Sequence, residues 1–203
     1  MISNNKILNN LPKKREQYQP FLEELASLFT EMDSAYNNTA AQYEFICKGC
    51  TDNCCMTRFY HHTLAEYLFI ESGFRDLAPD IQQIACQESA AVKHAMQKAD
   101  ETQTPFQRMC PLNRKERCIL YAHRPMICRL HGIPHELRRP GQAPSFGPGC
   151  NDFNQQTQKK EYIPFNRTPF YIQMAQLEKN IRDTTGFHEK IKMTIADMVI
   201  LCR

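Results

Sequence analysis

The stretch Cys47-Lys48-Gly49-Cys50-Thr51-Asp52-Asn53-Cys54-Cys55 places four thiols within nine residues. Thiolates this close repel one another unless a cation neutralises them. A zinc ion or an iron–sulfur cluster does so, and it also fixes the distances between its ligands. The sequence therefore predicts a metal site built from cysteine sulfur, to which four later cysteines can contribute: Cys110, Cys118, Cys128 and Cys150.

Length and composition are those of an ordinary globular protein. The chain has 203 residues, of which 42% are hydrophobic and 23% are charged, so it can bury a sizeable core. We expect one domain over residues 1–203. The formal charge of +3 is too small to indicate a nucleic-acid partner.

The cell compartment decides how ten cysteines are interpreted. The N-terminal segment is polar and Asn-rich, without the apolar run of a secretory signal, and no stretch of about 18 apolar residues predicts a membrane span. We therefore expect a cytoplasmic protein with no membrane partner. Cytoplasmic thiols stay reduced, which favours metal ligation over disulfides. A disulfide-rich or thiol-redox protein is the alternative.

The pattern of apolar residues predicts a mainly α-helical fold with few or no strands. A cysteine-cluster core of about 45–150 would be irregular and stabilised by metal, because Pro and Gly recur every few residues between 105 and 169. Flanking helices are expected over 11–36 and 168–202. Apolar residues at helical spacing predict five helices in all, at about 11–36, 63–73, 81–99, 168–182 and 188–201.

Capping and turn residues suggest where these elements begin and end. Asn37-Asn38 marks the expected end of the first helix, and Pro20 fits its first turn or a break before it. Thr63 to Glu66 resembles a capping box, and Gly73 a helix stop. Thr168-Pro169 is expected to cap and start a helix, whereas Arg138–Pro148 is expected to be a loop.

The spacing of the cysteines leaves their partners open. Cys47 and Cys50, two residues apart, can reach one metal ion from a tight turn. Adjacent Cys54 and Cys55 rarely serve one tetrahedral centre well, so either one of them is a bystander or the two serve different centres. Eight clustered cysteines allow two four-thiolate sites, or one site with spare thiols.

A second set of motifs follows the cluster, namely Cys110-Pro111, Cys118 to Tyr121, and Arg124-Pro125-Met126-Ile127-Cys128-Arg129. Together with Cys47 to Cys55, this order resembles the zinc- or iron-chelating cysteine-cluster domain family, the CxxCxxCC family. The resemblance covers roughly residues 45–150. The chain departs from the family pattern in one place, because three residues rather than two separate Cys50 from Cys54-Cys55.

The resemblance implies chelation of zinc or iron. A flagellin lysine methylase carries a similar cluster and is linked to an iron–sulfur centre, so an iron–sulfur-dependent enzyme, including a methyl transferase, is a further alternative. The expected cofactor is zinc or iron in an iron–sulfur cluster, and no substrate or protein partner is indicated. The expected ligands are Cys47, Cys50, Cys54, Cys55, Cys110, Cys118, Cys128 and, as an eighth candidate, Cys150.

Several other residues have both a functional and a structural interpretation. Arg124 and Arg129 could bind a substrate carboxylate or offset thiolate charge, or Arg124 could cap a turn. His61, His62 and His123 are expected around the metal rather than on it, and His131 and His135 are the better ligand candidates. Two residues are interpreted as structural, Cys86 and Cys202, and Tyr121 is expected to pack beside the site.

Overall fold

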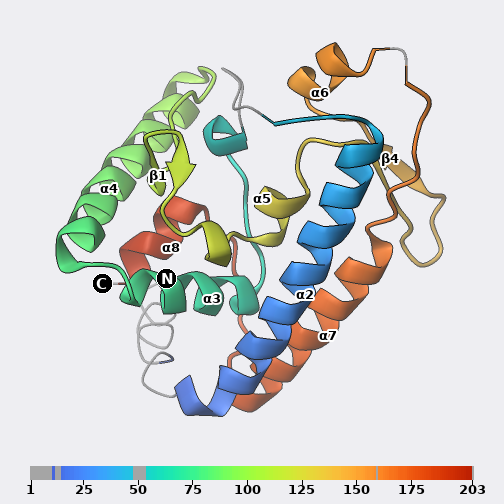
Figure 1. Ribbon diagram of the computed structural model, residues 1–203. Helices are drawn as coiled ribbons and strands as arrows, with labels where there is room; N and C mark the ends of the chain where they lie inside the picture. Colours follow the sequence, from blue (N-terminus) through green and yellow to red (C-terminus); the bar gives the residue numbers. More distant parts are fainter. Residues whose placement is uncertain (1–10, 12–14, 48–53, 159, 203) are drawn as a thin grey trace.

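A computed structural model gives the structure of the protein and describes residues 11, 15–47, 54–158 and 160–202. As predicted, the described chain is mainly helical (Figure 1). Long helices are α2 (Arg15–Gln42), α4 (Pro79–Thr102) and α7 (Thr168–Thr185), and the shorter ones are α3 (Leu64–Arg75), α5 (Met126–Leu130), α6 (Asn151–Gln156) and α8 (Ile195–Leu201). Short 3₁₀ helices occur at η2 (Cys54–Met56) and η3 (Tyr121–His123).

The described strands form two small antiparallel hairpins, as the expectation of few strands allows. β1 (Asn113–Arg114) pairs with β2 (Arg117–Cys118), and β3 (His135–Leu137) pairs with β4 (Ser145–Gly147). β4 lies inside the segment Arg138–Pro148 that was expected to be a loop, so that expectation is wrong for its last part. Pro and Gly weaken strands, so a sequence segment rich in both gives no indication that β3 and β4 pair.

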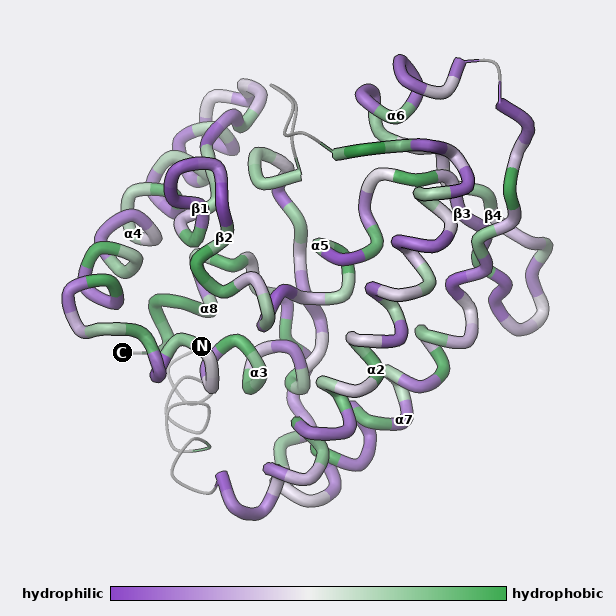
Figure 2. The backbone as a smooth tube through the Cα atoms, viewed as in Figure 1, coloured by the Kyte–Doolittle hydropathy of each residue, from purple (hydrophilic) through white to green (hydrophobic). Residues whose placement is uncertain are grey.

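Helix α3 is the central helix of the fold. It contacts α2, α7 and α8, and every residue from Leu64 to Phe74 is buried. In Figure 1, α2 and α7 lie side by side on one flank, and α4 packs with α8 on the other. Hydrophobic residues are concentrated along α3, as Figure 2 shows, because a helix covered on several sides needs no polar face.

The start of α3 is fixed by two side chains. Thr63 is its N-cap, as predicted, and its hydroxyl accepts a hydrogen bond from the Glu66 amide at 3.3 Å. Glu178 of α7 reaches across and accepts from the amides of Leu64 at 2.8 Å and Ala65 at 2.9 Å. Three of the four amides that a helix start leaves without intrahelical partners are therefore satisfied, and α7 is tied to α3.

Three predicted helix boundaries are wrong. α2 continues through Asn37-Asn38 to Gln42, because Thr39 and Ala40 are buried against the fold, and Pro20 lies inside it rather than in its first turn. Gly73 does not end α3 but lies within it. A methyl group added at Gly73 would lie 2.4 Å from the His123 ring, so the glycine permits close packing there.

The C-terminal helices also differ in their starts. Thr168 is the first residue of α7 rather than its cap, and its hydroxyl accepts from the Arg138 amide at 2.8 Å. α8 begins only at Ile195, after a complete capping box formed by Thr194 and Asp197. Residues 187–194, where a helix was expected from about 188, are not helical, and Met193 forms a β-bridge with His61. In the described part of the chain, no helix is both long enough and apolar enough to cross a bilayer.

Replacing Glu178 by Gln should destabilise the protein by roughly 1–3 kcal/mol, because two buried amides would lose a charged acceptor. Urea unfolding followed by circular dichroism measures this change. Glu31→Gln, on the exposed face of α2, is the matched control and should change the unfolding free energy by less than about 0.5 kcal/mol. Equal effects of the two substitutions would contradict the role of Glu178.

Candidate metal centre

The cysteine-bearing segments meet through backbone hydrogen bonds. The Cys110 amide donates to the carbonyl of Cys55 at 2.7 Å, which joins the segment after α4 to η2. In the hairpin that follows, Asn113 lies opposite Cys118. Lys115 and Glu116 form its turn with φ of 50° and 65°, so both occupy the left-handed region that a two-residue hairpin turn requires. Cys55, Cys110 and Cys118 are thereby brought to one side of the molecule.

Backbone amides point at three of the cysteine sulfurs. The amides of Leu112 and Asn113 donate to the Cys110 sulfur, and the Leu120 amide donates to that of Cys118. The sulfur of Cys150, at the start of α6, accepts from the Phe153 amide at 3.4 Å. Amide donors favour the charged thiolate, which is the form that binds metal.

The position of Cys128 depends on a buried carboxylate. Cys128 lies in α5, and the amide of the first α5 residue, Met126, donates to Glu66 Oε1 at 3.0 Å. The other oxygen, Oε2, accepts from the Thr63 hydroxyl at 2.5 Å. Glu66 therefore links the start of the central helix α3 to the start of the helix that carries Cys128.

Arg129 holds the same segment from the other side. Its side chain is 4% exposed and donates to Asp33 of α2 at 2.5 Å. It also donates to the carbonyls of Arg124 and Ala122, and it lies over the Phe29 ring. The loop before Cys128 thus closes around a buried guanidinium that is paired with a carboxylate, as a buried charge requires.

Arg124 contributes to the same network. It makes a second, longer contact of 3.4 Å to Asp33, and its guanidinium lies 3.6 Å from the centre of the Tyr121 ring. Its charge lowers the pKa of Cys55 and, with that of Arg129, the pKa of Cys118, although burial raises the latter overall. Both arginines therefore hold the loop and offset thiolate charge.

Four cysteines form what we call the inner cluster: Cys55, Cys110, Cys118 and Cys128. Burial raises the pKa of the Cys128 thiol, and charge on any of the other three raises it further. Burial likewise raises the pKa of Cys110, to about 12. Without a cation, Cys110, Cys118 and Cys128 stay protonated at neutral pH, because burial and charge on a neighbouring thiol both oppose their ionisation. Cys55 differs from them, since its pKa is lowered.

The adjacent pair was expected to diverge, but the sulfurs of Cys54 and Cys55 interact. The Cys54 thiol donates to the Cys55 sulfur, which lowers the pKa of Cys55 and raises that of Cys54. Cys55 also accepts from the Asn113 side chain. Charge on Cys128 and on Cys47 raises the pKa of Cys54 further, so Cys54 lies between the inner cluster and a second set of cysteines.

This second set, the outer group, comprises Cys47, Cys54 and Cys150 and surrounds Tyr36 of α2. Burial raises the pKa of Tyr36, and charge on each of the three thiols raises it further. The Cys150 amide donates to the carbonyl of Gly132 at 2.8 Å, and a methyl group at Gly132 would lie 2.7 Å from the Tyr36 hydroxyl. These contacts place Cys150 and Tyr36 together.

Cys47 reaches the outer group through its neighbour. The side chain of Gln156 in α6 pairs with the backbone of Ile46, accepting from its amide at 3.3 Å and donating to its carbonyl at 3.1 Å. Phe153 packs edge-on against the rings of Tyr43 and Phe45. These contacts fix the segment that leads to Cys47 against α6. Cys150 is the N-cap residue of the same helix.

The donor set suits zinc or iron–sulfur chemistry, because it consists of thiols with amide donors and arginines beside them. No two of the described cysteines are joined by a disulfide. Over the described ranges, no three His, Cys, Asp or Glu side chains are yet close enough to hold one ion. Binding would have to draw the sulfurs of a group together by side-chain rotation. Cys50 lies outside the described residues.

The other predicted residues have mixed outcomes. The ring of His131 packs against that of Phe59, and His135 lies against Gly147, so neither histidine is placed among the cysteines by these contacts. Tyr121, which was expected to pack beside the site, lies against the Arg124 guanidinium but is 63% exposed. Two structural assignments are consistent with their surroundings, since the thiols of Cys86 and Cys202 both donate to α8 carbonyls.

Sequence reasoning missed two carboxylates that position the cysteines. Glu66 and Asp33 lie in helices outside the cysteine motifs, and only their tertiary contacts show what they do. His61, which is 3% exposed, has its Nδ1 4.0 Å from Glu66 Oε1. Because Glu66 is the N3 residue of the predicted capping box, the sequence indicated only a local hydrogen bond to the start of α3. It did not indicate that the same carboxylate reaches α5.

Removing the charge of Arg129 with Arg129→Met should cost roughly 1.5–3 kcal/mol of unfolding free energy, because a buried guanidinium loses its charge-assisted hydrogen bonds to Asp33 and to two backbone carbonyls. A double-mutant cycle that combines Arg129→Met with Asp33→Asn, measured by urea unfolding, should give an interaction free energy of at least about 1 kcal/mol between the two residues. Arg114→Met, on the exposed hairpin, is the control. Strictly additive effects of the Arg129 and Asp33 changes would contradict the pairing.

Metal-stripped protein should lose stability as the pH rises from 8 to 10. The folded-state pKa values of Cys110, Cys118 and Cys128 are raised, so their contribution is complete below the pKa of an unfolded thiol, about 8.5, and declines above it. Each thiol contributes a slope of up to about 1.4 kcal/mol per pH unit. Urea unfolding at several pH values measures the slope, which Cys110→Ala should reduce. An unchanged slope in Cys110→Ala would contradict the burial of that thiol.

Comparison with known protein families, curated proteins and solved structures finds no match for this chain.

Proposed function

We propose that the protein binds zinc or an iron–sulfur cluster through the thiolates of the inner cluster. The observation that carries the proposal is the gathering of Cys55, Cys110, Cys118 and Cys128 from separate segments of the chain. Four thiols that oppose one another's ionisation gain most from a shared cation. Four sulfur ligands are also the full set of a structural zinc site or of a single iron–sulfur cluster.

The surroundings of the inner cluster support this proposal. Arg124 and Arg129 offset the negative charge that a four-thiolate site carries, and amides point at the sulfurs of Cys110 and Cys118. Such outer contacts orient ligands and tune a metal site. Because Cys110, Cys118 and Cys128 are protonated at neutral pH without metal, binding should release protons and weaken as the pH falls.

The outer group bears on the number of centres. Charge on Cys47, Cys54 or Cys150 raises the pKa of Tyr36, and Cys54 also donates to Cys55 of the inner cluster. A second ion bound there would give two metal equivalents per chain, or two clusters, whereas a purely supporting outer group would give one. The metal-to-protein ratio of anaerobically purified protein distinguishes these two arrangements.

Thiol-redox chemistry is a second candidate, favoured by one observation. The Cys54 thiol donates to Cys55, whose pKa is lowered, so Cys55 has the character of a nucleophilic thiolate. A protein of this class would bind no metal and would react at Cys55 with a thiol-specific reagent at neutral pH. Metal loading should instead protect Cys55 from that reagent, which separates the two candidates.

We also propose that the chain is a member of the zinc- or iron-chelating cysteine-cluster family and works in the reducing cytoplasm. The ordered cysteine motifs support membership, and thiols without disulfides among the described residues are compatible with a reducing compartment. An iron–sulfur-dependent enzyme, including a methyl transferase, is the functional extension that this membership brings.

Cys128→Ser should lower the bound metal by at least about tenfold, because it removes a thiolate that the other three cannot replace. Elemental analysis of protein purified without oxygen gives the metal content. Colour identifies the metal, since an iron–sulfur protein is brown and a zinc protein is colourless. Cys47→Ser tests the outer group in the same way.

The matched control is Cys86→Ala, which removes a buried thiol of α4 whose sulfur lies 4.0 Å from the Val199 carbonyl oxygen. It should leave the metal content unchanged. Full metal content and an unaltered melting curve in Cys128→Ser would rule out the inner cluster as the site. Loss of metal in Cys86→Ala would show that metal content reports general unfolding rather than ligation.

A further inference from the structure

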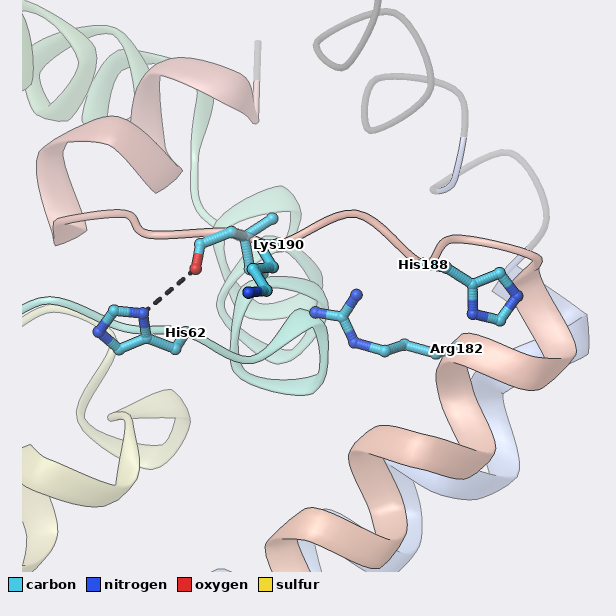
Figure 3. Close-up of a pocket in the computed structure, with 5 residues that line it drawn as sticks. His62, Arg182, His188 and Lys190 are labelled. Carbon is cyan, nitrogen blue, oxygen red and sulfur yellow. Dashed lines mark hydrogen bonds between the residues drawn. The ribbon is translucent and has the colours of Figure 1, made fainter.

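A pocket of about 380 Å³ lies on elements other than those that carry the inner cluster. Five residues line it, and they come from the segment before α3, the last turn of α7 and the connection from α7 to α8: His62, Arg182, His188, Lys190 and Ile191. Figure 3 shows the guanidinium of Arg182 lying between Lys190 and His188, with His62 facing the same space. The lining contains four nitrogen-bearing side chains and no carboxylate.

The neighbouring carboxylates are already engaged or turned inward. Glu178 accepts from Arg182 at 2.5 Å and from the two amides at the start of α3. Asp183 pairs with Lys179 at 2.6 Å. Glu189 does not line the pocket, and its Oε2 is buried. Glu178 therefore offsets the charge of Arg182, whereas Lys190 forms no ion pair with the carboxylates of the described residues.

Two of the lining side chains are held in place before any ligand arrives. Arg182 donates to the carbonyls of Phe187 at 3.3 Å and Glu189 at 2.7 Å, in addition to Glu178. His62 is fixed through a 3.2 Å contact between its Nδ1 and the carbonyl of Ile191. A carbonyl only accepts, so Nδ1 carries the proton in this contact. Fixed donors lower the entropy cost of binding.

We propose that this pocket binds a small organic anion through a carboxylate or phosphate group. The guanidinium of Arg182 and the ammonium of Lys190 are donors that such oxyanions accept from, and charge-assisted hydrogen bonds are the strong ones. The ring of His62 donates to the ligand only as an imidazolium, because its Nδ1 proton goes to the Ile191 carbonyl. Ile191 supplies an apolar wall for the carbon part of the ligand. The volume exceeds that of a single oxyanion and matches a small metabolite-sized molecule.

The test uses the full chain as purified and two probes, inorganic phosphate and succinate, in about 0.15 M NaCl, where exposed charges beyond about 8 Å are screened. Amide NMR signals of residues 187–191 report binding. At least one probe should shift these signals along a saturable curve, and the probe that binds more tightly identifies the phosphate or the carboxylate as the preferred group.

Lys190→Gln should weaken binding of the tighter-binding probe by about tenfold, because one charge-assisted hydrogen bond is lost. Lys190 and His188 are exposed, so Lys190→Gln and the second variant His188→Asn should keep the native fold and melting temperature. Lys179→Gln is the matched control, because it removes the same charge from the exposed face of α7 and leaves the lining intact.

Two results would overturn the proposal. The first is linear, unsaturable shifts with both probes. The second is equal weakening by Lys190→Gln and Lys179→Gln, which would show that binding follows net charge rather than the pocket. Neither result bears on the metal content, so this proposal and the proposed function fail or succeed separately.

Discussion

The ion pair between buried Arg129 and half-buried Asp33 fixes the part of the chain on which the inner cluster depends. Through it, η3, α5 and the residues between them are anchored to the long helix α2, and the carbonyls of Arg124 and Ala122 close around the same guanidinium. Glu66 anchors the next residues from the side of α3. Cys128 is held between these two anchors, so the fold positions it without a disulfide and before any metal is considered.

The same geometry creates an electrostatic conflict. Burial raises the pKa values of Cys110, Cys118 and Cys128, and each thiolate raises those of its neighbours. Arg124 and Arg129 relieve only part of this cost. Such a protein keeps Cys110, Cys118 and Cys128 protonated, or it binds a cation that stabilises all four cysteines as thiolates. In the second case, the bound cation would stabilise the irregular centre of the fold.

Local sequence predicted much of this fold. α4 and α7 were expected because Pro79 and Pro169 open them and apolar residues recur at helical spacing, and Thr63 was identified as a cap. What failed depended on tertiary contacts. Gly73 resembles a helix stop, yet it is a packing glycine under the His123 ring, and the turn chemistry of Asn37-Asn38 is overridden because Thr39 and Ala40 are buried. For the site, spacing identified the cysteines, but their division into two groups and the roles of Glu66 and Asp33 required the structure.

X-ray absorption at the zinc and iron edges of anaerobically purified protein tests the central claim most directly, because it reports both the metal and its ligand atoms. The account predicts zinc or iron with a first shell of sulfur only, at about 2.3 Å for zinc. Protein that is fully folded but contains neither metal, or a metal surrounded by nitrogen and oxygen alone, would contradict it.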